Sequence, residues 1–257
     1  MSMIVSVLSF YSAVRGFADE SLYGGIISTG IFKQVFAAGT ISQDIVTIIS
    51  SVMIIILVVL YNRYKDMRIL ISIIGLLGYH FYAYGIYVIT AYYTSIYFIY
   101  MAIFTLSIFG VIIGVSGFAR EDINQLCLAK NLRVIGGVFL SLLVCVFVPM
   151  WIISMVPYIQ SHTVPDFYAV FILDLCFFMP FFIAVVYMLI KDYKPAYILL
   201  GIALIKTSTL VLSVAIGEVT VQSHGFEIDV AMAGVYFGAF VISLLLFIQY
   251  CLKLGDT

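Results

Sequence analysis

The chain has 257 residues, of which 64% are hydrophobic and 10% are charged, and its formal net charge is −1. Soluble domains carry roughly a quarter charged residues, so water is excluded as the main solvent of the folded chain. A nearly neutral charge also excludes nucleic acid as the expected partner. The four cysteines show no CxxC spacing and no clustering, so we predict no disulfide framework, no metal site and no cofactor.

The N-terminal region is apolar only over a short stretch. Residues 1–15 carry serines at helical spacing, a pattern that suits close helix packing. A helix of this length spans about 22 Å, so a short first span and an interfacial helix both remain open. The glycine-rich stretch at 16–40 predicts an external loop. We therefore assign residues 1–43 to a short N-terminal helix and an external loop.

Apolar runs of about 20 residues are long enough to cross a bilayer, and the rest of the chain contains seven of them. The expected spans are 44–61, 69–90, 95–118, 134–156, 167–190, 195–217 and 230–252. Together they predict an all-α fold, a polytopic helical membrane bundle over residues 44–252, with the N-terminal helix as a short eighth member. Residues 1–257 then form a single integral-membrane domain whose surrounding partner is the lipid bilayer.

Several residues predict where spans begin, end or bend. Ser42 is a candidate N-cap of the first span, because Asp44 in the next turn suits the positive end of the helix dipole. Pro157 is expected to end the fourth span and Pro180 to kink the fifth. Trp151 lies near the expected outer end of the fourth span, as interfacial tryptophans do.

The distribution of lysine and arginine predicts the orientation of the chain. Alternate loops and the C-terminal end hold nearly all of these residues: Arg63, Lys65, Arg68, Arg120, Lys130, Arg133, Lys191, Lys194 and Lys253. The intervening loops around Tyr92, His162 and His224 hold none. The positive-inside rule therefore predicts a multi-pass protein of the cell membrane with a cytoplasmic C-terminus.

Two charges fall inside apolar runs, Asp174 in the fifth span and Lys206 in the sixth. An ionisable residue in a membrane span is costly, which favours a paired, interior and functional position. At 1.5 Å per residue, Asp174 lies about 10 Å and Lys206 about 16 Å below the outer edge. The lysine stem covers the difference by snorkelling. A buried pair that only fixes helix register is the alternative.

Other polar side chains at similar depth share helix faces with these charges. They predict a polar cavity that faces outward, somewhat like the midplane sites of transporters. The candidate ligand-binding residues are Asp174, Lys206, Asp44, Gln43, Tyr82, Tyr84, His80, Thr209 and Ser213. The alternatives are an interfacial belt for the tyrosines and a hydrogen-bonded core position for His80.

The motifs exclude several enzyme classes and leave the function open. Walker A, GxSxG and HExxH patterns are absent from the sequence, so no catalytic residue is assigned. We expect a small-molecule transporter or binding protein. The alternatives are a membrane-embedded enzyme acting on a lipid or quinone, with Lys206 or His80 in proton transfer, and a structural or sensor subunit of a homo- or hetero-oligomeric membrane complex.

Several segments resemble a widespread family of uncharacterised prokaryotic polytopic membrane proteins: AAGTISQDIVTII, FYAYGIYVI, YFIYMAIFTLSIFGVI, and FILDLCFFMPFFIAVVYML with YILLGIALIKTSTLVLS. The similarity covers residues 30–213. Three features of this chain resemble the family pattern: the Gln43–Asp44 pair that opens one span, the tyrosine-rich span, and Asp174 early in a later span. The resemblance implies this topology and the plasma membrane of a prokaryote, and it implies no activity.

Overall fold

The structure is a computed structural model and describes residues 1–19, 21–23, 35–220 and 230–256. Its helices are α1 (Ser2–Ala18), α3 (Val35–Tyr64), α4 (Met67–Ile89), α5 (Tyr97–Ser116), α6 (Arg120–Gln125), α7 (Lys130–Ser161), α8 (Tyr168–Leu173), the π-helix η1 (Asp174–Phe178), α9 (Met179–Ile190), α10 (Pro195–Thr220) and α11 (Val230–Lys253). Two short strands, β1 (Leu126–Cys127) and β2 (Gly255–Asp256), pair antiparallel.

Within the described ranges, seven helical stretches of 20 to 32 residues are long and apolar enough to cross a membrane. At 1.5 Å per residue, even the shortest covers the hydrocarbon core of a bilayer, about 30 Å. The expected all-α bundle of seven spanning helices is therefore confirmed. The protein is a polytopic membrane protein.

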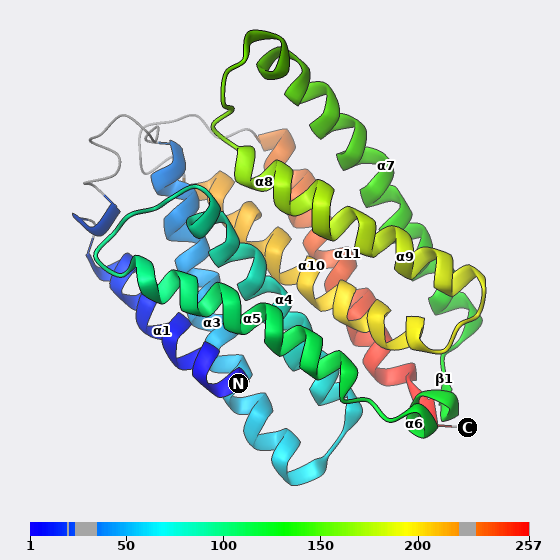
Figure 1. Ribbon diagram of the computed structural model, residues 1–257. Coiled ribbons are helices and arrows are strands. Elements are labelled where there is room, and N and C mark those ends of the chain that lie inside the picture. Colours follow the sequence, from blue (N-terminus) through cyan, green and yellow to red (C-terminus); the bar gives the residue numbers. More distant parts are fainter. Residues whose placement is uncertain (20, 24–34, 221–229, 257) are drawn as a thin grey trace.

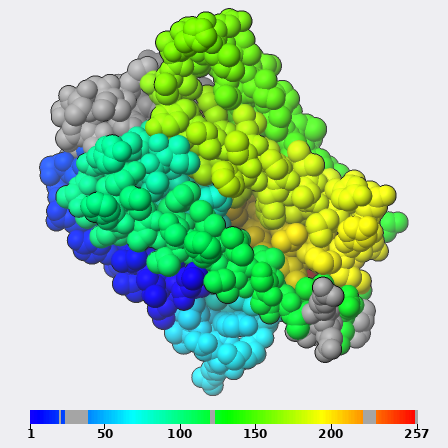
Figure 2. Space-filling view, in the orientation of Figure 1, coloured from blue at the N-terminus to red at the C-terminus, as the bar shows by residue number. Residues whose placement is uncertain are grey.

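Helix α10 runs through the middle of the molecule, between α4 and α9 (Figure 1), and it also packs against α3 and α11. In the space-filling view, α10 is visible at the floor of a hollow between α5 and α9 (Figure 2). The most apolar windows of α4 and α10 are each 72% buried, whereas that of α7 is only 6% buried. Helices α4 and α10 therefore form the centre of the bundle, and α7 lies at its edge.

Helix α1 lies antiparallel along α3 (Figure 1). Its serine stripe faces the bundle: Ser6, Ser9 and Ser12 are buried, and the Ser6 hydroxyl donates a hydrogen bond to the Ser51 carbonyl at 2.9 Å. The expected small-residue packing is thus present. Because α1 runs along the bundle instead of across its end, its placement favours the short first span over the interfacial helix.

Two expected helix boundaries were wrong. Helix α3 begins at Val35, well before Asp44, so Ser42 lies inside the helix and its hydroxyl donates to the Gly39 carbonyl at 2.9 Å. Helix α7 continues through Pro157 to Ser161. A proline removes one backbone donor, but ending a helix in an apolar environment would leave several backbone groups without water.

Parts of the predicted loops lie outside the described residues. These are residue 20, the stretch 24–34 with Lys33, and the stretch 221–229 with His224 and Glu227. The division of the chain at residue 43 stays a prediction. Helix α3, however, already begins at Val35, within the stretch 16–40 that was expected to be an external loop.

The fifth span is interrupted where Pro180 was expected to kink it. The Met179 N–H donates to the carbonyl of Asp174, five residues earlier, and residues 174–178 form the π-helix η1. Pro180 has no N–H, and its ring would press on the carbonyl of Cys176 in a regular α-helix. The wider π turn accommodates the ring, and it leaves both Asp174 and Phe178 buried.

One end of the bundle carries the basic loops, and we call it the basic end. Here α3, α5, α9 and α11 end, and α4, α7 and α10 begin. The β1–β2 pair joins the α6 region to the C-terminal segment at this end, where the Arg68 guanidinium donates to the Leu254 carbonyl at 2.5 Å. At the opposite end, Arg15 pairs with Asp19 at 3.2 Å.

Candidate ligand-binding cavity

A cavity of about 440 Å³ lies between the α3–α4–α10 side of the bundle and the α7–α8–α9 side. It is in the half of the bundle opposite the basic end, since it reaches Gly39 at the start of α3 and Gly217 near the end of α10. Its volume is within the range of small-molecule sites. Its polar lining includes Gln43, Asp174, Lys206, Thr207 and Ser213, and its apolar lining includes Phe147, Met179, Phe182 and Leu210.

Lys206 projects from α10 into aromatic surroundings. Its side chain is 3% exposed, and its Nζ lies 3.3 Å from the ring centroid of Phe178 and 4.6 Å from that of Tyr82. The stem passes close to α4, where a Cβ on Gly78 would lie 3.4 Å from the lysine Cγ. Aromatic faces attract an ammonium group, but they are weak acceptors for its three N–H donors.

Asp174 opens the π-helix on the other wall of the cavity. The indole N–H of Trp151 donates to its Oδ2 at 2.8 Å, and the Tyr82 phenol lies next to the same carboxylate. Trp151 also packs against Phe171, with ring centroids 5.2 Å apart. Helix α7 continues past Trp151 to Ser161, and the half-buried indole lines the cavity, so the expected interfacial position of Trp151 stays a prediction.

Asp174 and Lys206 face one cavity, but no direct ion pair joins them in the described structure. Each charge is close enough to influence the other. Hydrogen bonds from Nζ to a described residue are also absent. The arrangement therefore leaves ammonium donors at the cavity wall instead of using them in a closed pair.

Of the two hydroxyl residues of α10 that were predicted to bind a ligand, Ser213 lines the cavity and Thr209 does not. Lys206, Leu210 and Ser213 line the cavity, and so does Thr207. The Thr207 side chain is 3% exposed, and among the described residues its hydroxyl has no hydrogen-bond partner. Thr209 instead donates to the Ile205 carbonyl of its own helix at 2.9 Å. Thr207 is thus a cavity residue that the sequence reasoning missed.

Asp44 lies in a separate and closely packed group. Its carboxylate is 1% exposed, accepts a hydrogen bond from the Tyr23 hydroxyl at 2.8 Å, and lies directly against the backbone of Gly16. We call Gly16, Tyr23 and Asp44 the Asp44 cluster. Tyr87 packs against Tyr23 at 6.3 Å between ring centroids and also lines the cavity, so it forms part of the wall between the two regions.

The residues around this cluster form a hydrogen-bonded core. His80 is fully buried, its Nε2 lies 3.2 Å from the Ser50 hydroxyl, and its ring stacks on Tyr84 at 6.2 Å. The Tyr84 hydroxyl donates to the Ser9 carbonyl at 3.1 Å, and Gln43 Nε2 donates to the Ala83 carbonyl at 3.0 Å. These contacts connect α1, α3 and α4, which suits a packing role.

The predicted ligand-binding residues therefore separate into two sets. Those that line the cavity are Asp174, Lys206, Gln43, Tyr82 and Ser213; those packed outside it are Asp44, Tyr84, His80 and Thr209. Their roles in binding stay predictions. Sequence reasoning missed Trp151, Phe178 and Thr207, and only the lone tryptophan offered a hint, since it lies between two prolines of one apolar run.

Comparisons with protein-family models, curated proteins and solved structures gave no match. The resemblance to an uncharacterised prokaryotic family therefore stays a prediction. No group of three or more histidine, cysteine, aspartate or glutamate side chains able to hold a metal ion occurs in the described part of the chain. The fold and composition define the class, a polytopic membrane protein, and the function has to be argued from the cavity.

Proposed function

We propose that the protein binds a small molecule in the cavity and acts as a transporter or binding protein. The observation that carries this proposal is the Lys206 ammonium, which lines a cavity of about 440 Å³ and donates no hydrogen bond to a described residue. An intramembrane charge without a closed partner is costly unless it serves a ligand or a pathway. A purely structural pair would instead bring the two charges into direct contact.

The chemistry of the walls describes the ligand. The ammonium of Lys206 requires a hydrogen-bond acceptor, such as a carboxylate, phosphate or carbonyl group. Asp174 accepts a hydrogen bond from Trp151 and lies beside the Tyr82 hydroxyl, and its carboxylate also lines the cavity, where it can accept from a donor of the ligand. Phe147, Met179 and Leu210 supply an apolar surface. The expected ligand is a small amphiphile with an acceptor at one point and a donor at another.

The π-helix provides independent support for a functional position of Asp174. Single π turns within α-helices occur frequently at functional sites. Here the π turn begins at Asp174 and ends at Phe178, the ring closest to the Lys206 ammonium. The same local irregularity thus positions one charge and the aromatic neighbour of the other.

The orientation belongs to the proposal as well. The basic end is placed on the cytoplasmic side of a prokaryotic plasma membrane, together with the C-terminus, because positively charged loops remain inside. The cavity is then in the outer half of the bundle, as expected for a site that receives its ligand from outside.

Trp151 allows a direct test, since it is the only tryptophan of the chain and lies at the cavity wall. The purified protein is titrated with a panel of zwitterionic and anionic amphiphiles while its intrinsic fluorescence is followed. We expect saturable quenching by one chemical class. Lys206→Met is expected to weaken that affinity at least tenfold, because a charge-assisted hydrogen bond is lost, and Lys253→Met, on an exposed surface, serves as the matched control.

Uptake into proteoliposomes then distinguishes a transporter from a binding protein. Accumulation of the bound compound that is lost in Lys206→Met indicates a transporter. Binding without accumulation indicates a binding protein that does not transport. The proposal is wrong if no compound of the panel changes the fluorescence, or if both Lys206→Met and Asp174→Asn bind with wild-type affinity. Elution as a single species in gel filtration confirms that each variant is folded.

A further inference from the structure

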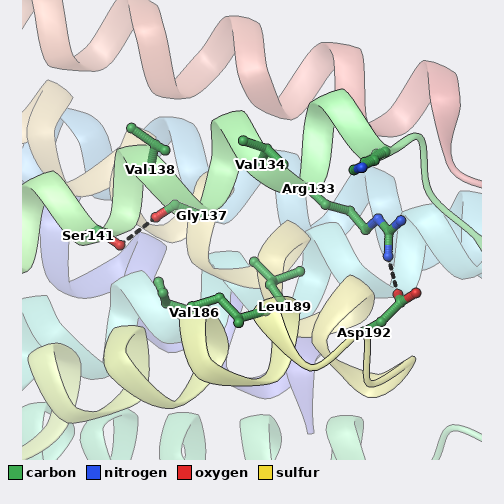
Figure 3. A pocket seen from close by; sticks show the side chains of 10 residues that line it. Arg133, Val134, Gly137, Val138, Ser141, Val186, Leu189 and Asp192 are labelled. Carbon is green, nitrogen blue, oxygen red and sulfur yellow. Dashed lines mark hydrogen bonds and ion pairs between the residues drawn. The ribbon is translucent and has the colours of Figure 1, made fainter.

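A second hollow, separate from the cavity, lies between α7 and α9 at the basic end (Figure 3). Its volume is about 410 Å³. One end holds Lys130, Arg133 and Asp192, and the rest is formed by apolar or small residues of the two helices, among them Val134, Gly137, Val138, Val186 and Leu189. We call it the α7–α9 groove.

The apolar part of the groove is open to the lipid. Val134 is 55% exposed, Val138 is 54% exposed and Ile190 is 76% exposed. Gly137 leaves space in the floor, since a Cβ at this position would meet only Leu189 Cδ1, at 3.8 Å. From Lys130 to Ser141 the groove follows α7 for about 16 Å, a length that suits part of an acyl chain.

The polar end of the groove carries an excess of positive charge. Arg133 donates through Nη1 to the Tyr197 hydroxyl at 2.9 Å and forms an ion pair with Asp192. A hydrogen bond from Tyr197, together with the positive charge of Arg133, holds the pKa of Asp192 below its usual value, so its carboxylate is ionised at neutral pH. Lys130, Lys191 and Lys194 add three further cations in or next to this region.

We propose that the α7–α9 groove binds one anionic phospholipid of the surrounding bilayer. Its phosphate lies between Lys130 and Arg133, and one acyl chain follows Val134, Gly137 and Val138. Basic pockets between spanning helices recognise anionic headgroups in this way. The ion pair with Asp192 fixes the guanidinium at the rim, while Lys130 has no described ion-pair partner and is left for the phosphate.

This site does not depend on the proposed function of the cavity. The groove and the cavity have no lining residue in common. A bound lipid would fill the α7–α9 groove. Helix α7 packs mainly against α9 and has few other contacts with the bundle. The lipid would therefore act as a structural ligand that seats α7 against its neighbour.

Native mass spectrometry of the purified full-length protein tests the proposal. The protein is exchanged into mixed micelles that contain equal amounts of phosphatidylglycerol and phosphatidylcholine with identical acyl chains, and retained lipid is counted after mild activation. We expect one phosphatidylglycerol per protein to be retained in preference to phosphatidylcholine. Equal retention of the two lipids by the wild-type protein would overturn the proposal without any variant.

Two variants test the two ends of the groove separately. Lys130→Gln is expected to reduce the preference for phosphatidylglycerol roughly fivefold, since one basic side chain near the headgroup is lost. Gly137→Leu fills the apolar floor and is expected to abolish retention. The matched controls are Lys253→Gln at the same end of the bundle and Gly238→Leu on α11, where a Cβ would meet nothing within 4 Å; both should retain the lipid as the wild type does.

A free phosphate is distinguished from a lipid by competition. Inorganic phosphate and the glycerophosphoglycerol headgroup without acyl chains are added in millimolar excess. We expect neither to displace the lipid, because the acyl chain contributes much of the binding. Displacement by the headgroup alone, or unchanged retention in Gly137→Leu, would reduce the groove to a simple anion site and overturn the lipid assignment.

Discussion

Asp44 and Asp174 are both buried carboxylates within apolar helices, and both were predicted to bind a ligand, but they lie in opposite surroundings. Asp44 is enclosed by Gly16 and Tyr23 and does not line the cavity. Asp174 is on the cavity wall, bonded to Trp151 through one oxygen, and shares its space with Lys206. The first carboxylate is part of a packed core, and the second faces a space that a molecule can occupy.

The comparison shows that burial of a charge does not by itself identify a ligand site. In the Asp44 cluster, Tyr23, which follows α1 in the chain, donates a hydrogen bond to the carboxylate, and Gly16 of α1 lies against it. At Asp174, the π turn and the loosely packed α7 leave room beside it. The difference comes from the neighbours: α3 is packed closely by α1, whereas α7 has contacts mainly with α9.

The largest expected effect concerns chemical accessibility. In a variant in which the native cysteines at 127, 145, 176 and 251 are replaced by serine, Thr207→Cys should react with a water-soluble thiol reagent roughly a hundredfold faster than Ser51→Cys. Local opening of a packed core costs at least a few kcal/mol, whereas Thr207 lines the cavity. Rates are measured by mass shift. Equal rates would mean that the cavity is closed to water and would remove the contrast between the two regions.

Gly16→Ala is expected to lower stability by about 2 kcal/mol, because overpacking of a filled core costs 1–3 kcal/mol. The added methyl group would overlap Asp44 Oδ2 and the Tyr23 hydroxyl. Thermal unfolding in detergent, followed by circular dichroism, measures the change. Gly238→Ala, with open space around its Cβ, is the control and should be neutral or slightly stabilising. A neutral Gly16→Ala would show that the cluster is loosely packed.

Tyr23→Phe and Tyr82→Phe make the same chemical change in the two regions. Removing the Tyr23 hydroxyl leaves a buried acceptor without its donor, which costs about 1.5 kcal/mol. The Tyr82 hydroxyl lies beside Asp174 at the cavity, where water can replace it, so we expect a cost below about 0.5 kcal/mol. Chemical denaturation of both variants in parallel gives the comparison. A larger loss for Tyr82→Phe would reverse the assignment of core and cavity.

The smallest expected effect is that of Asp44→Asn on the cavity. The amide oxygen can still accept from Tyr23, and Asp44 does not line the cavity. The affinity measured by Trp151 fluorescence should therefore change by less than about twofold, since distant sites act independently. Asp174→Asn, in contrast, should weaken it by about tenfold. If the two substitutions weakened the affinity to a similar extent, the two carboxylates would act as one functional unit.

Local features of the chain predicted the spanning helices and pointed to part of the cavity. The apolar runs placed seven spanning helices, and the unusual positions of Asp174 and Lys206 drew attention to the helices that line the cavity. The helical periodicity of α4 brings His80, Tyr84 and Tyr87 to one face, where their rings are in contact. It could not tell that this face packs against α1 and α3, because the faces of a membrane helix are nearly equally apolar.

The sequence by itself determined that the chain is an all-α membrane protein, because backbone groups in lipid must be satisfied within each span. Only the tertiary structure decided which polar side chains meet at the cavity. Trp151 and Asp174 come from different helices, and their contact depends on how α7 seats against the fifth span. The separation of Asp44 from the cavity likewise depends on α1 and Tyr23, distant in sequence from α10, and such packing is a property of the assembled bundle.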